Sequence, residues 1–329
     1  MLQPDNEGGT ELSTNALFFR TWRKDIVLER PFGSQLGQWV LGMLSITLVT
    51  AIWGYSNVVI RQSEMTVPPG ILLGMRFGIA GVIMVPVLFR ARLSWKLWLV
   101  GLGTGALLGV GTLAQGWAMF TLPVDEVAFI TALYVVLTPL GMALLQRRLP
   151  VRRIWVAVAV SLAGVTLLIG KLTVHLHIGI LWSLVAAVGL TGQIIGTTAL
   201  IRGISVWQLV GLQSVGAAMA LILAIAFQGL SHPAMYAGLF QWPMRDWIWI
   251  GYLALLATLL AVFLQSWGQR RISATEAALV FNMEPMWTAV FAWVILSQHM
   301  TIPQFIGAGL IIGSLTLVSR SRRSPEHNV

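Results

Sequence analysis

Glu284 is the most evident candidate for a chemical role, because it is a carboxylate ten residues into an apolar segment, 274–297. If that segment crosses a membrane, a rise of 1.5 Å per residue puts Glu284 roughly 15 Å deep, near the midplane. A charge there costs a few kcal/mol or more unless it is neutralised, paired or hydrated. Glu284 then either faces a cavity and binds a substrate ammonium or exchanges a proton, or hydrogen-bonds a neighbouring helix beside a kink at Pro285. The sequence leaves both predictions open.

Arg76 is the one basic residue inside an apolar segment, seven residues after Pro69. At that distance, about 10 Å from the segment's edge, its side chain can reach the lipid headgroups or form a structural pair. The rival prediction is a guanidinium that holds a substrate carboxylate through two hydrogen bonds. Arg76 and Glu284 together would suit a zwitterionic amino acid, but the sequence does not tell whether the two share a cavity.

Five residues recur at a spacing of 150 in two apolar stretches of similar length. Gln115, Trp117, Glu126, Ala128 and Thr138 return as Gln265, Trp267, Glu276, Ala278 and Thr288. Internal repeats of multi-helix halves are typical of membrane transporters, in which the halves move around a central site. At the same spacing Tyr134 lies opposite Glu284, so we expect both at similar depth.

Further polar or aromatic side chains within apolar segments are candidates for substrate contact, although each also fits helix packing. Besides Glu284, Arg76 and Tyr134, these candidates are Trp53, Asn57, Trp117, Gln115, Trp267, Gln265, Asn282 and Gln213. Pro285 and Pro139 are candidate hinges.

The composition identifies an integral membrane protein, since 57% of the residues are hydrophobic, 10% are charged and the mean hydropathy is +0.79. The net charge of +9 resides in short segments between apolar runs, which argues against nucleic-acid binding. The sequence has no cysteine and none of the HExxH, GxSxG or GxxxxGK[ST] motifs. We therefore predict neither an enzyme nor a metal or cofactor site, and expect transport without ATP hydrolysis.

Ten apolar runs match the roughly 30 Å hydrocarbon core. They lack period-two alternation, so we expect helices. The predicted spans are 38–60, 69–89, 97–119, 124–146, 154–170, 178–201, 205–227, 246–268, 274–297 and 302–319.

The distribution of charge orients these spans. With the N-terminus in the cytoplasm, 17 Lys and Arg residues fall on that side, and Arg61, Lys171 and Arg245 on the other. This bias predicts that both termini are cytoplasmic. Five spans in each half imply an inverted second copy. We thus expect an all-α membrane protein of ten transmembrane helices in two inverted five-helix repeats, 38–170 and 171–319. A cytoplasmic N-tail, 1–37, either amphipathic or disordered, and a C-tail, 320–329, flank them.

Several short motifs carry a family resemblance. The first span reads Trp53-Gly54-Tyr55-Ser56-Asn57, the second has Pro69 and then Arg76-Phe77, the fourth runs LYVVLTPLG from Leu133 to Gly141, and the ninth contains Glu284-Pro285. Together they resemble the EamA-type ten-helix members of the drug/metabolite transporter (DMT) superfamily. The resemblance implies two inverted repeats, alternating access, and export or exchange of small metabolites such as amino acids. Gln213 matches a glutamine frequent in such proteins, whereas Tyr55 departs from the usual residue after Trp-Gly.

The sequence therefore predicts a secondary transporter that exports amino acids or related small polar or amphipathic metabolites. The alternatives are a flippase for lipids or lipid-linked precursors, and a non-transporting membrane partner protein. The expected partners are a small-molecule substrate, membrane lipids and protons as a coupling ion, with the chain a monomer or a homodimer in a bacterial inner membrane.

Overall fold

The fold is seen in a computed structural model that describes residues 36–63, 66–122, 124–169, 178–231, 241–297 and 299–321. Most of the expected N-tail, 1–37, and most of the expected C-tail, 320–329, lie outside the described residues.

The described chain is helical throughout its regular elements. In chain order these are α2 (Leu36–Ser63), α3 (Pro69–Phe89), α4 (Trp95–Met119), α5 (Val124–Thr131), α6 (Tyr134–Gln146), α7 (Arg152–Ile169), α8 (Ile178–Leu200), α9 (Val206–Ser231), α10 (Met244–Ala254), the π-helix η2 (Leu255–Leu260), α11 (Ala261–Gln269), α12 (Ala274–Phe281), α13 (Glu284–Leu296) and α14 (Ile302–Ser321).

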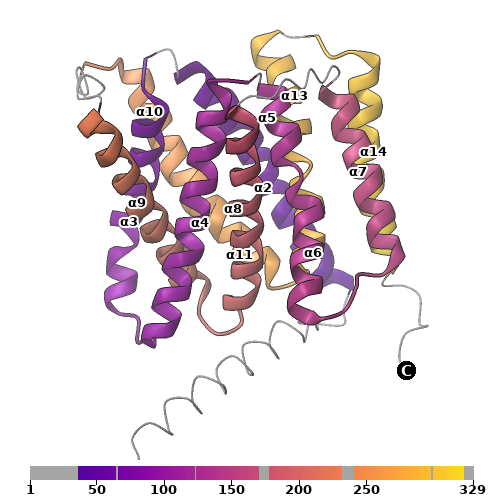
Figure 1. The fold of residues 1–329 in the computed structure, drawn as a ribbon, viewed down its shortest axis with the longest axis horizontal. Helices are drawn as coiled ribbons and strands as arrows, with labels where there is room; N and C mark the ends of the chain where they lie inside the picture. Colours follow the sequence, from indigo (N-terminus) through magenta and orange to yellow (C-terminus); the bar gives the residue numbers. More distant parts are fainter. Residues whose placement is uncertain are drawn as a thin grey trace, which may run out of the picture.

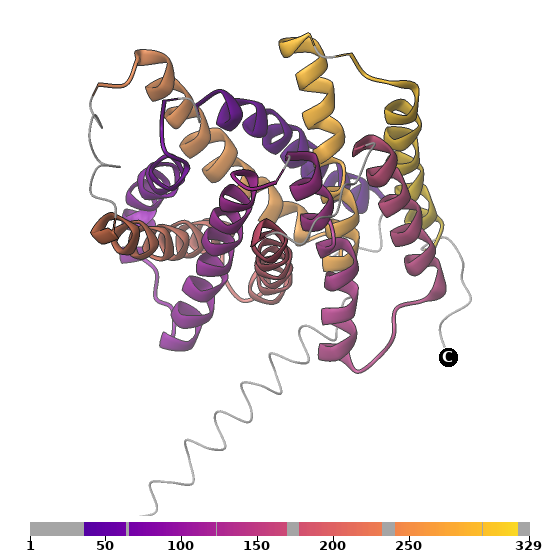
Figure 2. The ribbon, with the colours of Figure 1, turned by 45° about the horizontal axis from the view of Figure 1, so that its top comes forward.

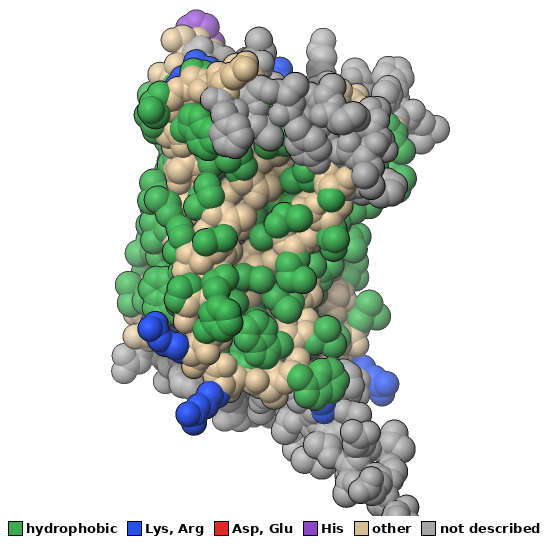
Figure 3. All heavy atoms as spheres, turned by 90° about the vertical axis from the view of Figure 1, so that its left-hand side faces the viewer, with side chains coloured by type: hydrophobic (Ala, Val, Ile, Leu, Met, Phe, Trp, Pro, Cys, Tyr) green, Lys and Arg blue, Asp and Glu red, His purple; other side chains and the backbone are tan. Residues whose placement is uncertain are grey.

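Nine helices within the described residues are long and apolar enough to cross a membrane, if α5–α6, α10–η2–α11 and α12–α13 each count as one. A tenth apolar helix, Ile302–Leu317 within α14, is shorter. Figure 3 shows hydrophobic side chains over most of the height of one face, with Lys and Arg at its two ends. These observations agree with the predicted all-helical integral membrane protein.

The helices form a bundle in which elements from the two halves of the chain alternate. Helix α2 packs against α11 and α13, and its counterpart α8 packs against α4 and α6. Helices α3 and α9 pair on one side of the bundle, and α7 and α14 pair on the opposite side (Figures 1 and 2). Each half therefore buries its apolar surface against the other, and neither forms a separate domain.

The 150-residue spacing of the sequence recurs in the helix boundaries. Helices α5 and α6 begin and end 150 residues before α12 and α13. Arg147 and Ser297, which close α6 and α13, are likewise 150 apart, and both adopt the left-handed conformation, with φ of 56° and 54°. Left-handed residues other than glycine are uncommon, so their recurrence at matched positions indicates that the two segments share one backbone design.

Three of the ten predicted spans are not single regular helices. The fourth and ninth spans are interrupted between α5 and α6 and between α12 and α13, and the eighth contains η2. Pro285 lacks the N–H that would bond to the carbonyl of Phe281, which favours the second interruption. The matching residue in the first copy is Val135, so proline reinforces a break that the first copy makes without one.

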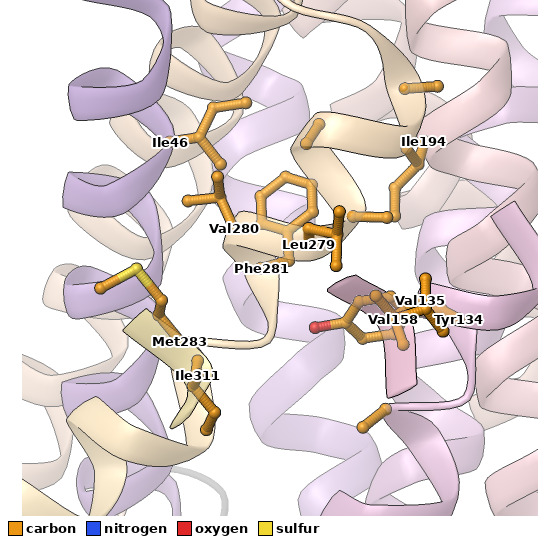
Figure 4. Packing of buried hydrophobic residues seen from close by; sticks show 14 of the residues in the cluster. Ile46, Tyr134, Val135, Val158, Ile194, Leu279, Val280, Phe281, Met283 and Ile311 are labelled. Atoms are coloured by element: carbon orange, nitrogen blue, oxygen red, sulfur yellow. The ribbon is translucent and has the colours of Figure 1, made fainter. Parts of the chain in front are cut away.

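The largest cluster of buried hydrophobic side chains surrounds α12. In Figure 4, Leu279, Val280 and Phe281 lie between Ile46 of α2 and Ile194 of α8. These five residues are at most 3% exposed. The packing fixes α12 against both halves of the chain and so sets the position of the break that follows it.

Candidate functional site

Glu284 is the first residue of α13, directly after the interruption of the ninth span. Its carboxylate Oε1 accepts a hydrogen bond from Asn57 Nδ2 of α2 at 2.9 Å. Asn57 Nδ2 also lies 3.1 Å from Thr288 Oγ1, which donates to the Glu284 carbonyl at 3.0 Å. The break thus gives the carboxylate a fixed orientation, held from a helix of the other half.

Close contact between α2 and α13 makes this hydrogen bond possible. A Cβ built on Gly54 would lie 2.6 Å from Trp287 Cβ and 2.9 Å from Thr288 N. A side chain at position 54 would therefore push the two helices apart. Gly54 brings the backbone of α2 near enough for Asn57, one turn further along, to reach Glu284.

A cavity of about 340 Å³ opens beside Glu284. Its walls come from both interrupted spans, with Thr131 and Tyr134 on one side and Glu284 and Thr288 on the other. Apolar side chains such as Leu168 make up most of the remaining wall. A volume at the lower end of the range for small-molecule sites, with few polar groups on apolar walls, is typical of a binding pocket for a small metabolite.

A second, smaller cavity of about 90 Å³ adjoins the first. Asn57, Gln115, Met119, Leu190 and Glu284 line both cavities. The small cavity adds Trp53 and Arg76, which do not line the large one. The structure therefore answers the question that the sequence left open, because Arg76 and Glu284 line the same cavity.

Arg76 is 6% exposed and so does not extend to the headgroups. Its Nε donates to Thr258 Oγ1 at 2.7 Å and its Nη2 to the carbonyl of Ala257 at 2.8 Å. Both acceptors belong to η2, where the wider π-helical turn changes the pairing of backbone carbonyls. Trp53 Nε1 donates to the same Ala257 carbonyl at 2.9 Å, and the Trp53 ring stacks on Phe281, 5.4 Å between centroids.

Besides Asn57, the first-half candidates that line the large cavity are Tyr134 and Gln115. Tyr134 begins α6 just as Glu284 begins α13. In Figure 4 its hydroxyl points away from Val135 and Val158, toward the side of the α12–α13 break. The expected correspondence between the two residues thus extends to their place at the cavity.

The other glutamine candidates lie in a buried hydrogen-bonded group, here called the glutamine network, of Gln193, Thr197, Gln213, Gln265 and Gln269. Gln193 Nε2 donates to Gln213 Oε1 at 2.8 Å, and Gln265 Nε2 donates to Gln193 Oε1 at 3.0 Å. All five side chains are at most 3% exposed. Because neither Gln213 nor Gln265 lines either cavity, the network holds α8, α9 and α11 together.

Three further candidates lie away from the two cavities. Asn282 is fully buried and its Nδ2 donates to Ser161 Oγ of α7 at 2.9 Å. Trp117 packs edge-on against Trp182, 4.8 Å between centroids. The Arg271 guanidinium lies 3.4 Å from the ring centroid of Trp267. Arg271 itself lies beyond the end of that span, where burial and then the charge of Arg270 lower its pKa.

The two candidate hinges differ in position. Pro285 is in the first turn of α13, next to the break, and lines the large cavity. Pro139 lies inside α6, beyond the break that precedes Tyr134. Only Pro285 therefore coincides with an interruption of its span.

Some residues at the site were not among the sequence candidates. Thr131 and Thr288 line the large cavity, and Thr258 holds Arg76. The repeat contained a signal for Thr288, because it matches Thr138. No sequence signal marks η2, because its apolar sequence, LLATLL, is equally suited to an α-helix.

Among the described residues, no group of three or more His, Cys, Asp and Glu side chains is placed to hold a metal ion. The chemical groups that line the two cavities are thus one carboxylate, the guanidinium groups of Arg76 and Arg61, and amides and hydroxyls. Such groups bind and orient a polar ligand or exchange a proton with it.

Comparison with known proteins gives three results. The model of the EamA-like transporter family matches residues 40–170 and again residues 177–320. An uncharacterized transporter from Archaeoglobus fulgidus is 24% identical over 286 residues, which cover 84% of this chain and 85% of that protein. A protein of known crystal structure, 18% identical, superposes with a TM-score of 0.70 over 88% of this chain and 100% of its own; this last likeness concerns the fold alone.

Proposed function

Because this chain belongs to the EamA-like transporter family, within the DMT superfamily, and is an integral membrane protein with a largely apolar cavity that Glu284 lines, we propose that it is a secondary transporter that works by alternating access. We propose that it exports amino acids or related small polar or amphipathic metabolites, with Glu284 as the group that receives the substrate. The chain then acts as a monomer or a homodimer in a bacterial inner membrane.

The observation that carries this proposal is the cavity of about 340 Å³ at the two interrupted spans, with Glu284 oriented at its wall by Asn57. A carboxylate in the membrane interior is costly, and in transporters such groups commonly mark substrate or proton pathways. Broken helices at a central site are also typical of secondary transporters. Glu284 combines these features at one position.

The arrangement of the two halves supports inverted repeats. The helix boundaries of α5–α6 and α12–α13 recur at one spacing, and the packing of α2 on α11 and α13 is matched by that of α8 on α4 and α6. In Figure 3 Lys and Arg gather at the lower end of the visible face, the end at which Figure 1 shows α14 finishing. By the positive-inside rule, this end and both termini are cytoplasmic.

The energy source that we propose is exchange against protons. Glu284 can carry either a proton or a substrate ammonium, because the two neutralise the same charge and so compete for it. Exit of a substrate through its ammonium group at Glu284 is then coupled to entry of a proton. This coupling needs no ATP-binding motif, in keeping with the sequence.

Transport by the purified protein in liposomes tests the proposal. The probes are radiolabelled neutral amino acids, each assayed with and without an imposed pH gradient. We expect saturable, gradient-dependent flux in the wild type, and in Glu284→Gln a loss of both the flux and its pH dependence. Glu276→Gln is the matched control, because Glu276 belongs to a capping box with Ser273, where glutamine also serves.

Two outcomes would contradict the proposal. Unchanged flux and pH dependence in a folded Glu284→Gln protein would remove Glu284 from the mechanism. Absence of amino acid flux in the wild type, together with scrambling of fluorescent lipids in the same liposomes, would favour a lipid flippase.

A further inference from the structure

Arg76 and Glu284 are opposite charges in one cavity, yet neither forms an ion pair within 4.0 Å with the other or with another described residue. A buried guanidinium without a carboxylate in direct contact is costly inside a membrane protein. The hydrogen bonds to η2 satisfy two of its N–H groups, but those acceptors are neutral. Glu284 faces Arg76 across the cavity, so a substrate that neutralises Glu284 alone removes the nearby counter-charge of the guanidinium.

A guanidinium has five N–H donors in a planar fork. With two of them bonded to Thr258 and Ala257, Arg76 is held in place and keeps donors for a ligand. The cavity that it lines has a volume of about 90 Å³, well above what one water molecule needs. That space accommodates a carboxylate group.

We propose that the small cavity is an anion subsite, in which Arg76 binds the carboxylate of a substrate whose ammonium group lies at Glu284. This inference rests on the proposed transport function and narrows its substrate class. The rest of the substrate lies in the large cavity, against walls such as Leu168 and Ala292. The substrate class is therefore a small α-amino acid with an uncharged side chain, bound at both of its charged ends.

The subsite gives a reason for discrimination against simple amines. An amine without the carboxylate fills the large cavity and neutralises Glu284, but it leaves the buried guanidinium without a counter-charge. Sites built around a buried polar group reject ligands that fail to pair with it, because the unpaired group keeps its desolvation cost. The carboxylate of the substrate, rather than its side chain, then decides entry.

Matched ligand pairs test the subsite in the wild-type protein. The probes are leucine, its decarboxylated analogue 3-methylbutylamine and leucine methyl ester, with phenylalanine and 2-phenylethylamine as a second pair. Their competition against a transported amino acid is measured in proteoliposomes. We expect each amino acid to compete at least about 10-fold more strongly than its amine or ester. Equal competition would overturn the subsite, while flux of the amino acid would leave the transporter proposal standing.

Variants then assign the discrimination to Arg76. In Arg76→Gln we expect leucine and 3-methylbutylamine to compete equally. Thr258→Ser keeps the hydroxyl that accepts from the guanidinium, so we expect it to retain the discrimination. Discrimination that persists in a folded Arg76→Gln protein, or that is lost equally in Thr258→Ser, would overturn the inference. If Arg76→Gln does not fold, the ligand pairs on the wild type still decide the question. Absence of any flux in the wild type would reject transport and subsite together.

Discussion

The interrupted spans α5–α6 and α12–α13 have the same backbone design but different chemistry. Both break after eight residues, resume for thirteen and end in a left-handed residue. The first copy begins its second segment with Tyr134 and the second copy with Glu284. The comparison indicates that the break places the first side chain of the resumed helix at the cavity in each half, and that only the second half supplies a carboxylate there.

The helices that precede the two interrupted spans, α4 and α11, also carry matching residues that have different roles. Gln115 and Gln265 occupy matching positions, yet Gln115 lines both cavities and Gln265 lies in the glutamine network. The repeat thus preserves helix boundaries, whereas the neighbours of each helix decide what a repeated side chain does. Four predictions test this comparison.

We expect the largest difference in transport efficiency between the variants Glu284→Gln and Tyr134→Phe. Loss of the charge that pairs with a substrate ammonium should reduce transport efficiency at least about 100-fold, whereas loss of the tyrosine hydroxyl should reduce it less than about 10-fold. Initial rates in proteoliposomes, at equal protein incorporation, measure both. Equal losses would mean that the two copies contribute alike.

Gly54→Ala and Gly141→Ala compare the helix contacts of α13 and α6. A Cβ at Gly54 meets Trp287 Cβ and the backbone of Thr288, whereas at Gly141 it meets the flexible end of Ile195, at 2.7 Å. We expect Gly54→Ala to cost about 1–3 kcal/mol and to impair transport by parting Asn57 from Glu284.

Thermal unfolding in detergent, followed by tryptophan fluorescence, measures these effects. Gly141→Ala should shift the midpoint less, since the Ile195 side chain can move aside. Gly78→Ala, which meets nothing within 4 Å, is the control and should leave the midpoint close to the wild type. A larger shift for Gly141→Ala than for Gly54→Ala would contradict the comparison.

Gln265→Leu and Gln115→Leu separate the network from the cavity. Gln265→Leu removes a donor to Gln193 and to Gln269, so we expect a loss of about 1 kcal/mol in stability with KM little changed. Gln115→Leu should raise KM and leave the unfolding midpoint nearly unchanged. The reverse pattern would assign the ligand contact to Gln265.

Pro285→Ala should have the smallest effect, less than about 1 kcal/mol in stability. The first copy breaks with Val135 at the matching position, so packing around α12 should preserve the break without the proline. Transport within a few-fold of wild type would support this reading. A variant that folds but no longer transports would show that the two breaks have different origins.

Much of the framework could be predicted from the sequence, because it depends on local composition. Each of the ten expected spans is helical in the described residues, with ends mostly within three residues of the predicted ones. Glu284 was recognisable as a site candidate because a carboxylate in a long apolar run stands out in sequence. The correspondence of Tyr134 with Glu284 followed from the repeat alone.

Side-chain roles that depend on the facing helix required the structure. Arg76, Gln213 and Asn282 each lie in an apolar run, but their partners are 182, 20 and 121 residues away in the sequence. The direction in which each residue faces depends on how its helix is rotated and what packs against it.

The amino-acid sequence by itself determined the membrane as solvent, the helical spans, the repeated halves and the depth of Glu284, since hydrophobicity and spacing act along the chain. The tertiary structure decided the rest: the π-helix that holds Arg76, the contact at Gly54 that brings Asn57 to Glu284, and the two adjoining cavities. Those features exist only where helices from the two halves meet, and the packing of distant segments is what determines them.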